Sequence, residues 1–364
     1  MNRRQWMIGA GGIAVLGGGA TLFTLYGMGS SSDYATRMAA LRAPLADPAL
    51  AVDLVRYATL APNGHNTQPW RFRVGNKRID ILPDFSRRTP VVDPDDHHVF
   101  VSLGAAAENL MLASAARGQP GALRFDPGEG VVRFDHDSAQ AIRSPLFDAI
   151  PKRQSTRTDY DGRAVGTAEL DMLARAAAVP GVDLVLLTDR IRIGHLRDLM
   201  VAGNSAQMAD AAFVRELKTW LRFNPRRALQ TGDGLYSVAS GSPALPDRIG
   251  PPAFDWLATP ASQNRAYARQ IDSSAGIAVF LGAAADPEHW VAVGQSCQRF
   301  ALQATALGLK HAFINQPVEV PGLRPELAAL VGAPGRRPDI VMRFGYGPTM
   351  PWSPRRPVAA VMVA

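Results

Sequence analysis

The stretch APNGHNTQPWRF, from Ala61 to Phe72, decides the fold of this chain of 364 residues. Its amide side chains lie between Pro62 and Pro69, and a proline fixes φ and disfavours helix in the residue before it. A short apolar helix is expected before this loop, over residues 54–60, and a strand after it, over residues 71–74. The amides therefore stand where an element ends and a ligand can be met. A turn whose amides bond only to the protein is the alternative.

This stretch resembles the flavin-contacting loop of the nitroreductase family, whose motif is A-P-S-x-x-N-x-Q-P-W-x-F. Asn63 stands here in place of the usual serine. Members of that family depend on FMN and bind it at the interface of two like subunits. The resemblance implies that the loop contacts FMN through Pro62, Asn63, Gly64, Asn66 and Gln68.

A second segment, KRQSTRTDY from Lys152 to Tyr160, has the composition of a phosphate site. Guanidinium groups and hydroxyls form charge-assisted hydrogen bonds with phosphate oxygens, although a charged turn between helices would look the same. The segment resembles the family's R-x-S-x-[RK] motif. By that resemblance Arg153 and Ser155 hold the FMN phosphate, and Arg157 reaches the pyrimidine edge of the ring.

Two later segments complete the predicted site. Near the end of the chain, Arg355 or Arg356 resembles the basic residues that finish the family's phosphate site, with a solvent-exposed basic tail as the alternative. The turn FINQPVE, residues 313–319, stands where the family places backbone N–H groups near the flavin N5. Pro317 has no N–H to donate, so either Asn315 and Gln316 supply this contact or the flavin N5 has less support.

The two halves of the chain repeat one order of elements. Long helices are expected over residues 99–117 and 290–307, each with small residues early and a glycine at its end. Gly104 allows close approach of another helix or of a flat ligand. The sequence predicts an α+β, nitroreductase-like fold in which two fused halves, residues 33–150 and 151–364, form a pseudo-dimer within one chain. The chain is therefore expected to be a monomer.

An insert over residues 221–272 is rich in Pro, Gly and Ser and shows no clear periodicity. Its aromatic residues are expected to be buried, which favours a lid over a disordered segment. The first half has the amide loop but no phosphate motif, and the second half has the reverse. One complete FMN site per chain is therefore expected. This arrangement resembles the Acg subgroup of nitroreductase-like proteins.

Residues 1–32 are expected to be a targeting segment. Arg3 and Arg4 precede a run without charge from Ile8 to Gly29, which resembles a twin-arginine signal. That route exports folded proteins, often with a cofactor already loaded. The protein is then expected in the periplasm or attached to the inner membrane, with anchoring through residues 8–29 as the alternative.

Composition excludes several other classes. A hydrophobic share of 47% and a charged share of 20% indicate an ordered globular protein. The net charge of +7 is spread along the chain, which argues against a nucleic-acid partner. Cys297 is the only cysteine, so no intrachain disulfide forms. The run from Asp93 to His98 suits a helix start better than a metal site, and no metal is expected.

Together these features predict an FMN-dependent oxidoreductase of the nitroreductase type. It would pass a hydride or electrons from a reduced small-molecule donor, NAD(P)H or a quinol, to a small acceptor. No side-chain acid or base is expected, because the flavin carries the chemistry. The alternative is an exported protein that binds or sequesters FMN under a closed lid with little turnover.

Overall fold

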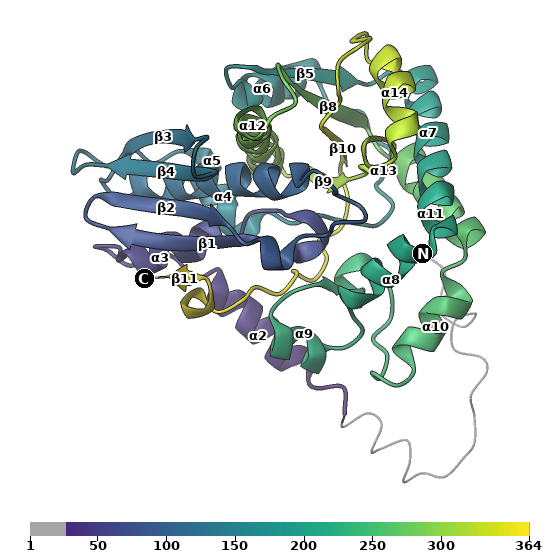
Figure 1. Cartoon of the computed structure of the whole chain (residues 1–364), viewed down its shortest axis with the longest axis horizontal. Coiled ribbons are helices and arrows are strands. Elements are labelled where there is room, and N and C mark those ends of the chain that lie inside the picture. The colour runs from purple at the N-terminus through teal and green to yellow at the C-terminus, as the bar shows by residue number, and fades with distance from the viewer. Residues whose placement is uncertain (1–26, 364) are drawn as a thin grey trace.

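The computed structural model describes residues 27–363, which form two main β-sheets around a central pair of helices (Figure 1). The first sheet has the strand order β11-β1-β2-β4-β3 and the second the order β5-β8-β10-β9. Within the described chain, the pairings in both sheets are antiparallel except that β11 runs parallel to β1. The strands of these sheets are β1 (Trp70–Gly75), β2 (Arg78–Pro83), β3 (Gly121–Asp126), β4 (Val131–His136), β5 (Val182–Leu187), β8 (Gly276–Gly282), β9 (Lys310–Phe313), β10 (Ile340–Gly345) and β11 (Met362–Val363).

The two sheets share one topology. In each, the first strand pairs with the second, the second with the fourth and the fourth with the third. A long helix links the second and third strands in both cases, namely α4 (His97–Ala115) and α12 (Pro287–Ala306). The order of elements expected to recur therefore does recur. The C-terminal strand β11 crosses back to the first sheet, so the end of the chain completes the sheet of the first half.

Helices α4 and α12 pack against each other through a reciprocal pair of glycines. A Cβ on Gly104 would lie 2.0 Å from the carbonyl oxygen of Val291, and one on Gly294 would lie 2.1 Å from the carbonyl oxygen of Val101. No side chain fits at either place, so glycine is what lets the backbones meet. The close approach predicted at Gly104 is confirmed, and its partner is a helix.

One apolar core extends through this helix pair into both sheets. It includes Leu103 and Leu110 on α4, Phe300 on α12, and Phe72 and Phe280 on the central strands, all fully buried. Helices α3 (Ala51–Ala58) and α6 (Thr167–Ala177) pack against α4 and α12 respectively. Helix α2 (Ser31–Leu41) packs instead on the insert, where Tyr34 and Met38 form a small apolar cluster with Tyr236. Helix α2 begins at Ser31, because the Ser30 hydroxyl accepts a hydrogen bond from the Asp33 N–H and caps it.

The expectation that the insert lacks periodic structure is wrong. It contains α9 (Pro225–Thr231), α10 (Gly250–Leu257), α11 (Pro260–Asp272) and the paired short strands β6 (Leu221–Arg222) and β7 (Leu235–Tyr236). Thr259 caps α11, and Tyr267 and Ile271, one turn apart, pack into an apolar core. The expectation of buried aromatics holds for Tyr236 but is wrong for Trp256, which is 80% exposed.

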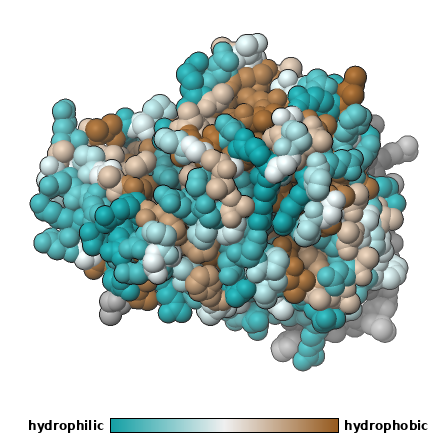
Figure 2. Space-filling model, turned by 45° about the horizontal axis from the view of Figure 1, so that its top comes forward, coloured by the Kyte–Doolittle hydropathy of each residue, from teal (hydrophilic) through white to brown (hydrophobic). Residues whose placement is uncertain are grey.

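Helices α7 (Arg190–Ala209) and α8 (Ala211–Thr219), which precede the insert, were not predicted. Figure 1 shows α7 and α11 side by side on the outer face of the second sheet. The remaining helices are α5 (Pro145–Ala149), α13 (Gln316–Glu319) and α14 (Arg324–Leu330). In the face shown in Figure 2, polar and charged residues cover most of the surface and apolar ones form small groups.

Most of the predicted targeting segment, residues 1–26, lies outside the described residues. The predictions of a twin-arginine signal and of anchoring through residues 8–29 therefore remain predictions. Among residues 27–363, no helix is long and apolar enough to cross a membrane.

Candidate functional site

The amide loop has an unusual backbone. His65, Asn66 and Gln68 all have left-handed φ angles, of 45°, 56° and 55°. The Asn63 side-chain oxygen holds this shape by accepting a hydrogen bond of 2.7 Å from the Gln68 N–H. Non-glycine residues keep such angles only where the surroundings enforce them, and such strain gathers at functional sites.

The insert and the C-terminal segment hold the loop in place. Asn66 Nδ2 donates to the carbonyl oxygens of Gly234 and Pro354, at 3.0 and 3.1 Å. Gln68 Nε2 donates to the carbonyl oxygen of Gly232 at 2.8 Å. The amides of Asn66 and Gln68 thus bond to the protein, and contact of these residues with a cofactor stays a prediction. Pro62 is buried in the same loop, whereas Asn63 and Gly64 remain partly accessible.

Of the two C-terminal arginines, Arg355 points inward. Its guanidinium donates to Asn66 Oδ1 at 2.9 Å and to the carbonyl oxygens of Leu60 and Ala61, which follow helix α3. Arg356 lies on the other side of the loop, where its N–H donates to Gln68 Oε1 at 2.9 Å. Packing therefore decides which arginine faces inward: Arg355 is buried, and Arg356 supports the loop from outside, whereas a role of Arg355 in cofactor binding stays a prediction.

Arg153 reaches the same place from the second half of the chain. Its Nη2 donates to the carbonyl oxygen of Leu60 at 2.8 Å, the oxygen that Arg355 also contacts. Its Nε and Nη1 are buried without a hydrogen-bond partner. The amide loop and the predicted phosphate motif thus meet, although they lie far apart in the sequence.

A third arginine joins this cluster. Arg42, at the end of α2, has a buried Nε without a partner, and its guanidinium lies over the Trp352 ring at 4.7 Å. Within residues 27–363, no carboxylate forms a salt bridge with Arg42, Arg153 or Arg355. We refer to these three residues as the arginine cluster. Sequence analysis missed Arg42, because the segment ATRMAALRAPL around it resembles no phosphate motif.

Burial and mutual repulsion destabilise the charged form of the guanidinium groups in the arginine cluster. Burial lowers the pKa of Arg153 to about 9, and the neighbouring Arg355 contributes to this shift. Burial likewise lowers the pKa of Arg355 to about 10, and that of Arg42 well below its usual value, with Arg355 and Arg153 adding to the effect. The buried His311 beside them has its pKa lowered by burial and then by Arg153, so it stays neutral. Such a cluster is a ready-made site for an anion.

The other residues of the phosphate motif lie on the strand-like segment beside β9. Ser155 forms a parallel backbone bridge with His311. Arg157 follows, and burial lowers its pKa. In the described part of the chain no salt bridge involves Arg157, whose charge also acts on His65 of the amide loop.

The turn after β9 lies on the same side as His65. Asn315 Oδ1 accepts a hydrogen bond of 2.9 Å from the Val341 N–H, which fixes its amide so that Nδ2 faces Nε2 of His98 at 3.3 Å. Gln316 begins the short helix α13, where it packs against Gly203 of α7. His98, which comes from the first turn of α4, was not predicted to be a site residue.

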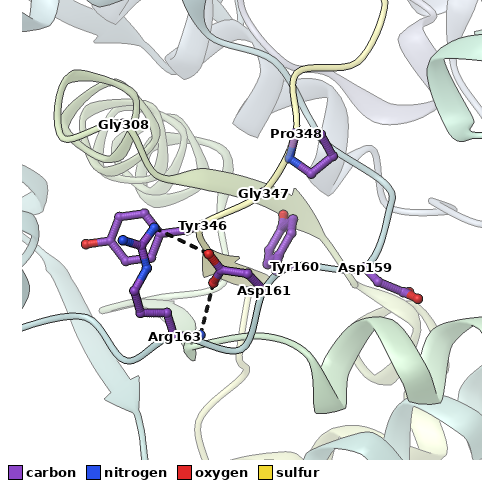
Figure 3. A pocket seen from close by; sticks show the side chains of 8 residues that line it. All are labelled: Asp159, Tyr160, Asp161, Arg163, Gly308, Tyr346, Gly347 and Pro348. Atoms are coloured by element: carbon purple, nitrogen blue, oxygen red, sulfur yellow. Dashed lines mark hydrogen bonds and ion pairs between the residues drawn. The ribbon is translucent and has the colours of Figure 1, made fainter. Parts of the chain in front are cut away.

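A hollow of about 430 Å³ lies at the end of the Lys152–Tyr160 segment, where Asp159 and Tyr160 line it together with Arg163 and Tyr346 (Figure 3). Figure 3 shows Arg163 between Asp161 and the ring of Tyr346, and its guanidinium lies 3.8 Å from the ring centroid. Arg163 pairs with Asp161, and Asp159 adds a second carboxylate, so this hollow offers less to an anion than the arginine cluster does.

Comparisons with known proteins give the following picture. No protein-family model matches the sequence. A Mycobacterium tuberculosis H37Rv protein provisionally named an NAD(P)H nitroreductase is 27% identical over 324 residues, covering 84% of this chain and 88% of the relative. A second protein of that strain, provisionally named NAD(P)H nitroreductase acg, is 24% identical over 84% of this chain and 93% of its own length.

Among solved structures, an FMN-bound nitroreductase of Desulfitobacterium hafniense is 18% identical, with a TM-score of 0.36 and coverage of 59% of this chain and 94% of that one. The resemblance to nitroreductases predicted from the sequence, the Acg subgroup included, is confirmed by the sequence relatives. Together with the two sheets and their helices, it confirms the predicted α+β, nitroreductase-like fold.

Proposed function

We propose that this chain is an FMN-dependent oxidoreductase of the nitroreductase type that takes electrons from NAD(P)H. The observation that carries the proposal is the arginine cluster, in which three buried or half-buried guanidinium groups meet without a carboxylate. The similarity to proteins named NAD(P)H nitroreductases supports the donor, and the FMN bound in a solved nitroreductase is in keeping with the cofactor.

The residues fit the phosphate of FMN. A buried charge without a partner costs several kcal/mol, and two nitrogens of Arg153 and one of Arg42 are in that state. A phosphate carries nearly two negative charges and three acceptor oxygens, which would satisfy these donors with charge-assisted hydrogen bonds. Arg42, Arg153 and Arg355 would hold the phosphate, with Ser155 beside them.

Other predicted residues would face the ring. Arg157 has no anionic partner in the described chain, and a cation near the pyrimidine edge favours the anionic reduced flavin. The accessible part of the amide loop, at Asn63 and Gly64, and the turn at Asn315 and Gln316 would border the ring as well. When bound, FMN accepts a hydride from the nicotinamide and passes electrons on to a small acceptor such as a quinone or a nitroaromatic.

We propose one such site per chain. The amide loop belongs to the first half and Arg153 to the second, and Arg153 bonds to the carbonyl oxygen of Leu60, the residue directly before the loop. In the repeated topology, the place equivalent to the amide loop in the second half is the segment RAAAVPGVDLVLL, which has no amides. This asymmetry is what two fused, diverged halves would give.

Flavin content and reducibility test the proposal together. The purified full chain should release close to one FMN per polypeptide on denaturation. Anaerobic NAD(P)H should bleach its flavin absorbance, and a quinone should restore it. A chain that takes up no FMN contradicts the proposal, and two FMN per chain contradict the single site. Bound FMN that NAD(P)H cannot reduce would favour a sequestering protein over an enzyme.

A further inference from the structure

We propose that His98 is the residue that exchanges protons with the reacting molecule in this site, and that Asp93 and Glu319 are the positioning residues that orient it. The inference deepens the proposed function and rests on it, because it assigns a role beside the same cofactor. It adds a side-chain acid and base where sequence analysis expected none.

His98 lies between two segments that are predicted to border the flavin ring. A Cβ built on Gly64 of the amide loop would lie 3.8 Å from the Cβ of His98. On its other side, Nε2 of His98 lies 3.3 Å from Nδ2 of Asn315. The side chain is 12% exposed, so it is neither sealed in the core nor free on the surface.

Asp93 fixes the inner end of the imidazole. Its Oδ1 lies 3.4 Å from Nδ1 of His98, and both of its oxygens accept hydrogen bonds of 3.0 Å from the His98 backbone N–H. Asp93 is only 2% exposed, so its carboxylate has little freedom to turn away. A carboxylate held in this way keeps Nδ1 protonated and leaves Nε2 as the atom that gains or loses a proton.

The outer nitrogen, Nε2, has a partner for each protonation state. Asn315 presents its NH₂ group, because its oxygen is already bonded to the Val341 N–H, and this donor favours a lone pair on Nε2. Glu319 places Oε1 4.0 Å from the same atom and favours a proton there. The side-chain Nε2 of Gln207 donates a hydrogen bond of 2.6 Å to Oε2 of Glu319 and anchors that carboxylate. A group that is protonated and deprotonated in each catalytic cycle needs a hydrogen-bond partner for both forms.

The surrounding charges favour the protonated ring. Burial opposes the charge of His98, but Asp93 and Glu319 outweigh burial and raise its pKa, while Arg337 acts against them. The neighbouring His97 and His65 have their pKa lowered to about 4, first by burial, so both stay neutral at ordinary pH. Burial also raises the pKa of Glu319, which brings that carboxyl closer to the range of the imidazole.

The same cluster does not suit a metal ion as well. Asp93, His97 and His98 could each offer a ligand atom within 4.8 Å of one another. However, Nε2 of His97 lies 3.0 Å from Asp339, and its ring is fully buried against Trp290. Nδ1 of His98 is turned toward Asp93 at 3.4 Å, so each of the two imidazoles already faces a carboxylate of the protein.

The proposed proton transfer conserves atoms and electrons. A quinone or nitro acceptor that receives a hydride, supplied in the end by NAD(P)H, also needs a proton on oxygen. The Nε2–H bond of the imidazolium breaks, an O–H bond forms on the acceptor, and the electron pair of the N–H bond stays on Nε2. A proton from water or from the Glu319 carboxyl then restores the imidazolium, whose charge Asp93 balances.

The test uses the FMN-loaded full chain with isotopically labelled histidine. We expect NMR titration to show a raised pKa for His98, and Asp93→Asn to lower it by about one unit or more. Rapid mixing of the reduced protein with a quinone should show that His98→Gln slows reoxidation roughly 10²- to 10⁴-fold and removes one ionisation from the pH profile. His289→Gln is the matched control, since His289 pairs with Asp286 at the surface end of α12. It should change neither the pKa of His98 nor the rate and pH profile of reoxidation.

The outcomes are separable. If His98→Gln keeps its FMN and reoxidises at the wild-type rate with an unchanged pH profile, the proton role is wrong. The same conclusion follows if the purified protein holds one divalent metal per chain that His98→Gln removes. If His98→Gln does not fold, Asp93→Asn and Glu319→Gln must show the altered pH profile instead. A wild-type chain that takes up no FMN would overturn the proposed function itself, which the flavin measurement reveals before any kinetics.

Discussion

The guanidinium of Arg355 donates a hydrogen bond of 2.9 Å to the side-chain oxygen of Asn66, 289 positions away in the sequence. Through this bond the C-terminal segment fixes the amide loop of the first half. Arg355 and Arg153 also donate to the same carbonyl oxygen, that of Leu60. Three segments distant in the sequence therefore meet at one point. The predictions below depend on this convergence.

Replacing Arg153 should weaken FMN binding. Arg153→Gln removes one or two charge-assisted hydrogen bonds, each contributing about 1.5–3 kcal/mol, so the Kd should rise roughly 10- to 150-fold for each bond lost. Fluorescence titration of the apoprotein with FMN measures this. Arg143→Gln, at a surface salt bridge with Asp148, should bind FMN as the wild type does. Equal affinity of the two variants would remove Arg153 from the site.

Replacing Arg42 should have different effects on the thermal stability of the apoprotein and of the FMN-bound protein. In the apoprotein Arg42 repels Arg153 and Arg355, so Arg42→Gln should leave its Tm unchanged or raise it. FMN should raise the Tm of the wild type by mass action and that of Arg42→Gln by less. Thermal scans with and without FMN measure both effects. An identical FMN-induced increase in both proteins would show that Arg42 does not take part in binding.

The glycine contact between α4 and α12 should be intolerant of a methyl group. Gly104→Ala places a Cβ about where the Val291 carbonyl oxygen lies, so the free energy of unfolding should fall by about 1–3 kcal/mol or more. Urea unfolding measures this. Gly322→Ala is the control, because no atom lies within 4 Å of its added Cβ, and it should change stability by less than about 0.5 kcal/mol. Equal stability of the two variants would contradict the packing.

Glu108, buried between α4 and α12, should make stability depend on pH. Burial raises its pKa to about 7 from an ordinary value near 4.5, so the folded protein binds more protons than the unfolded chain between these values. Stability from this group is therefore complete below about pH 4.5 and falls as pH rises toward 7, by up to about 1.4 kcal/mol per pH unit. Glu108→Gln should flatten the slope in urea unfolding between pH 5 and 7. A slope that is the same in both proteins would show that Glu108 is ionised in the fold.

Local sequence signals were sufficient for the repeated elements. The strand over residues 71–74 and the two long helices follow from apolar periodicity and from stops at Gly118 and Gly308, both of which have left-handed φ angles. The helices of the insert were missed because α10 and α11 begin at Pro-rich turns, and a short amphipathic pattern in such a stretch resembles a loop. Helix α11 packs on α7 and α9 on α2, contacts that no local pattern reveals.

By itself the sequence determined the repeated helices and strands of the two halves and which residues could bind an anion or a flavin, since these properties reside in side-chain chemistry and short-range spacing. It could not decide that Arg355 rather than Arg356 faces inward, that Arg42 joins Arg153, or that Asp93 and Glu319 flank His98. Each of these depends on contacts between residues distant in the chain, and such contacts form only when the two sheets close around α4 and α12 and fix which side of each segment is buried.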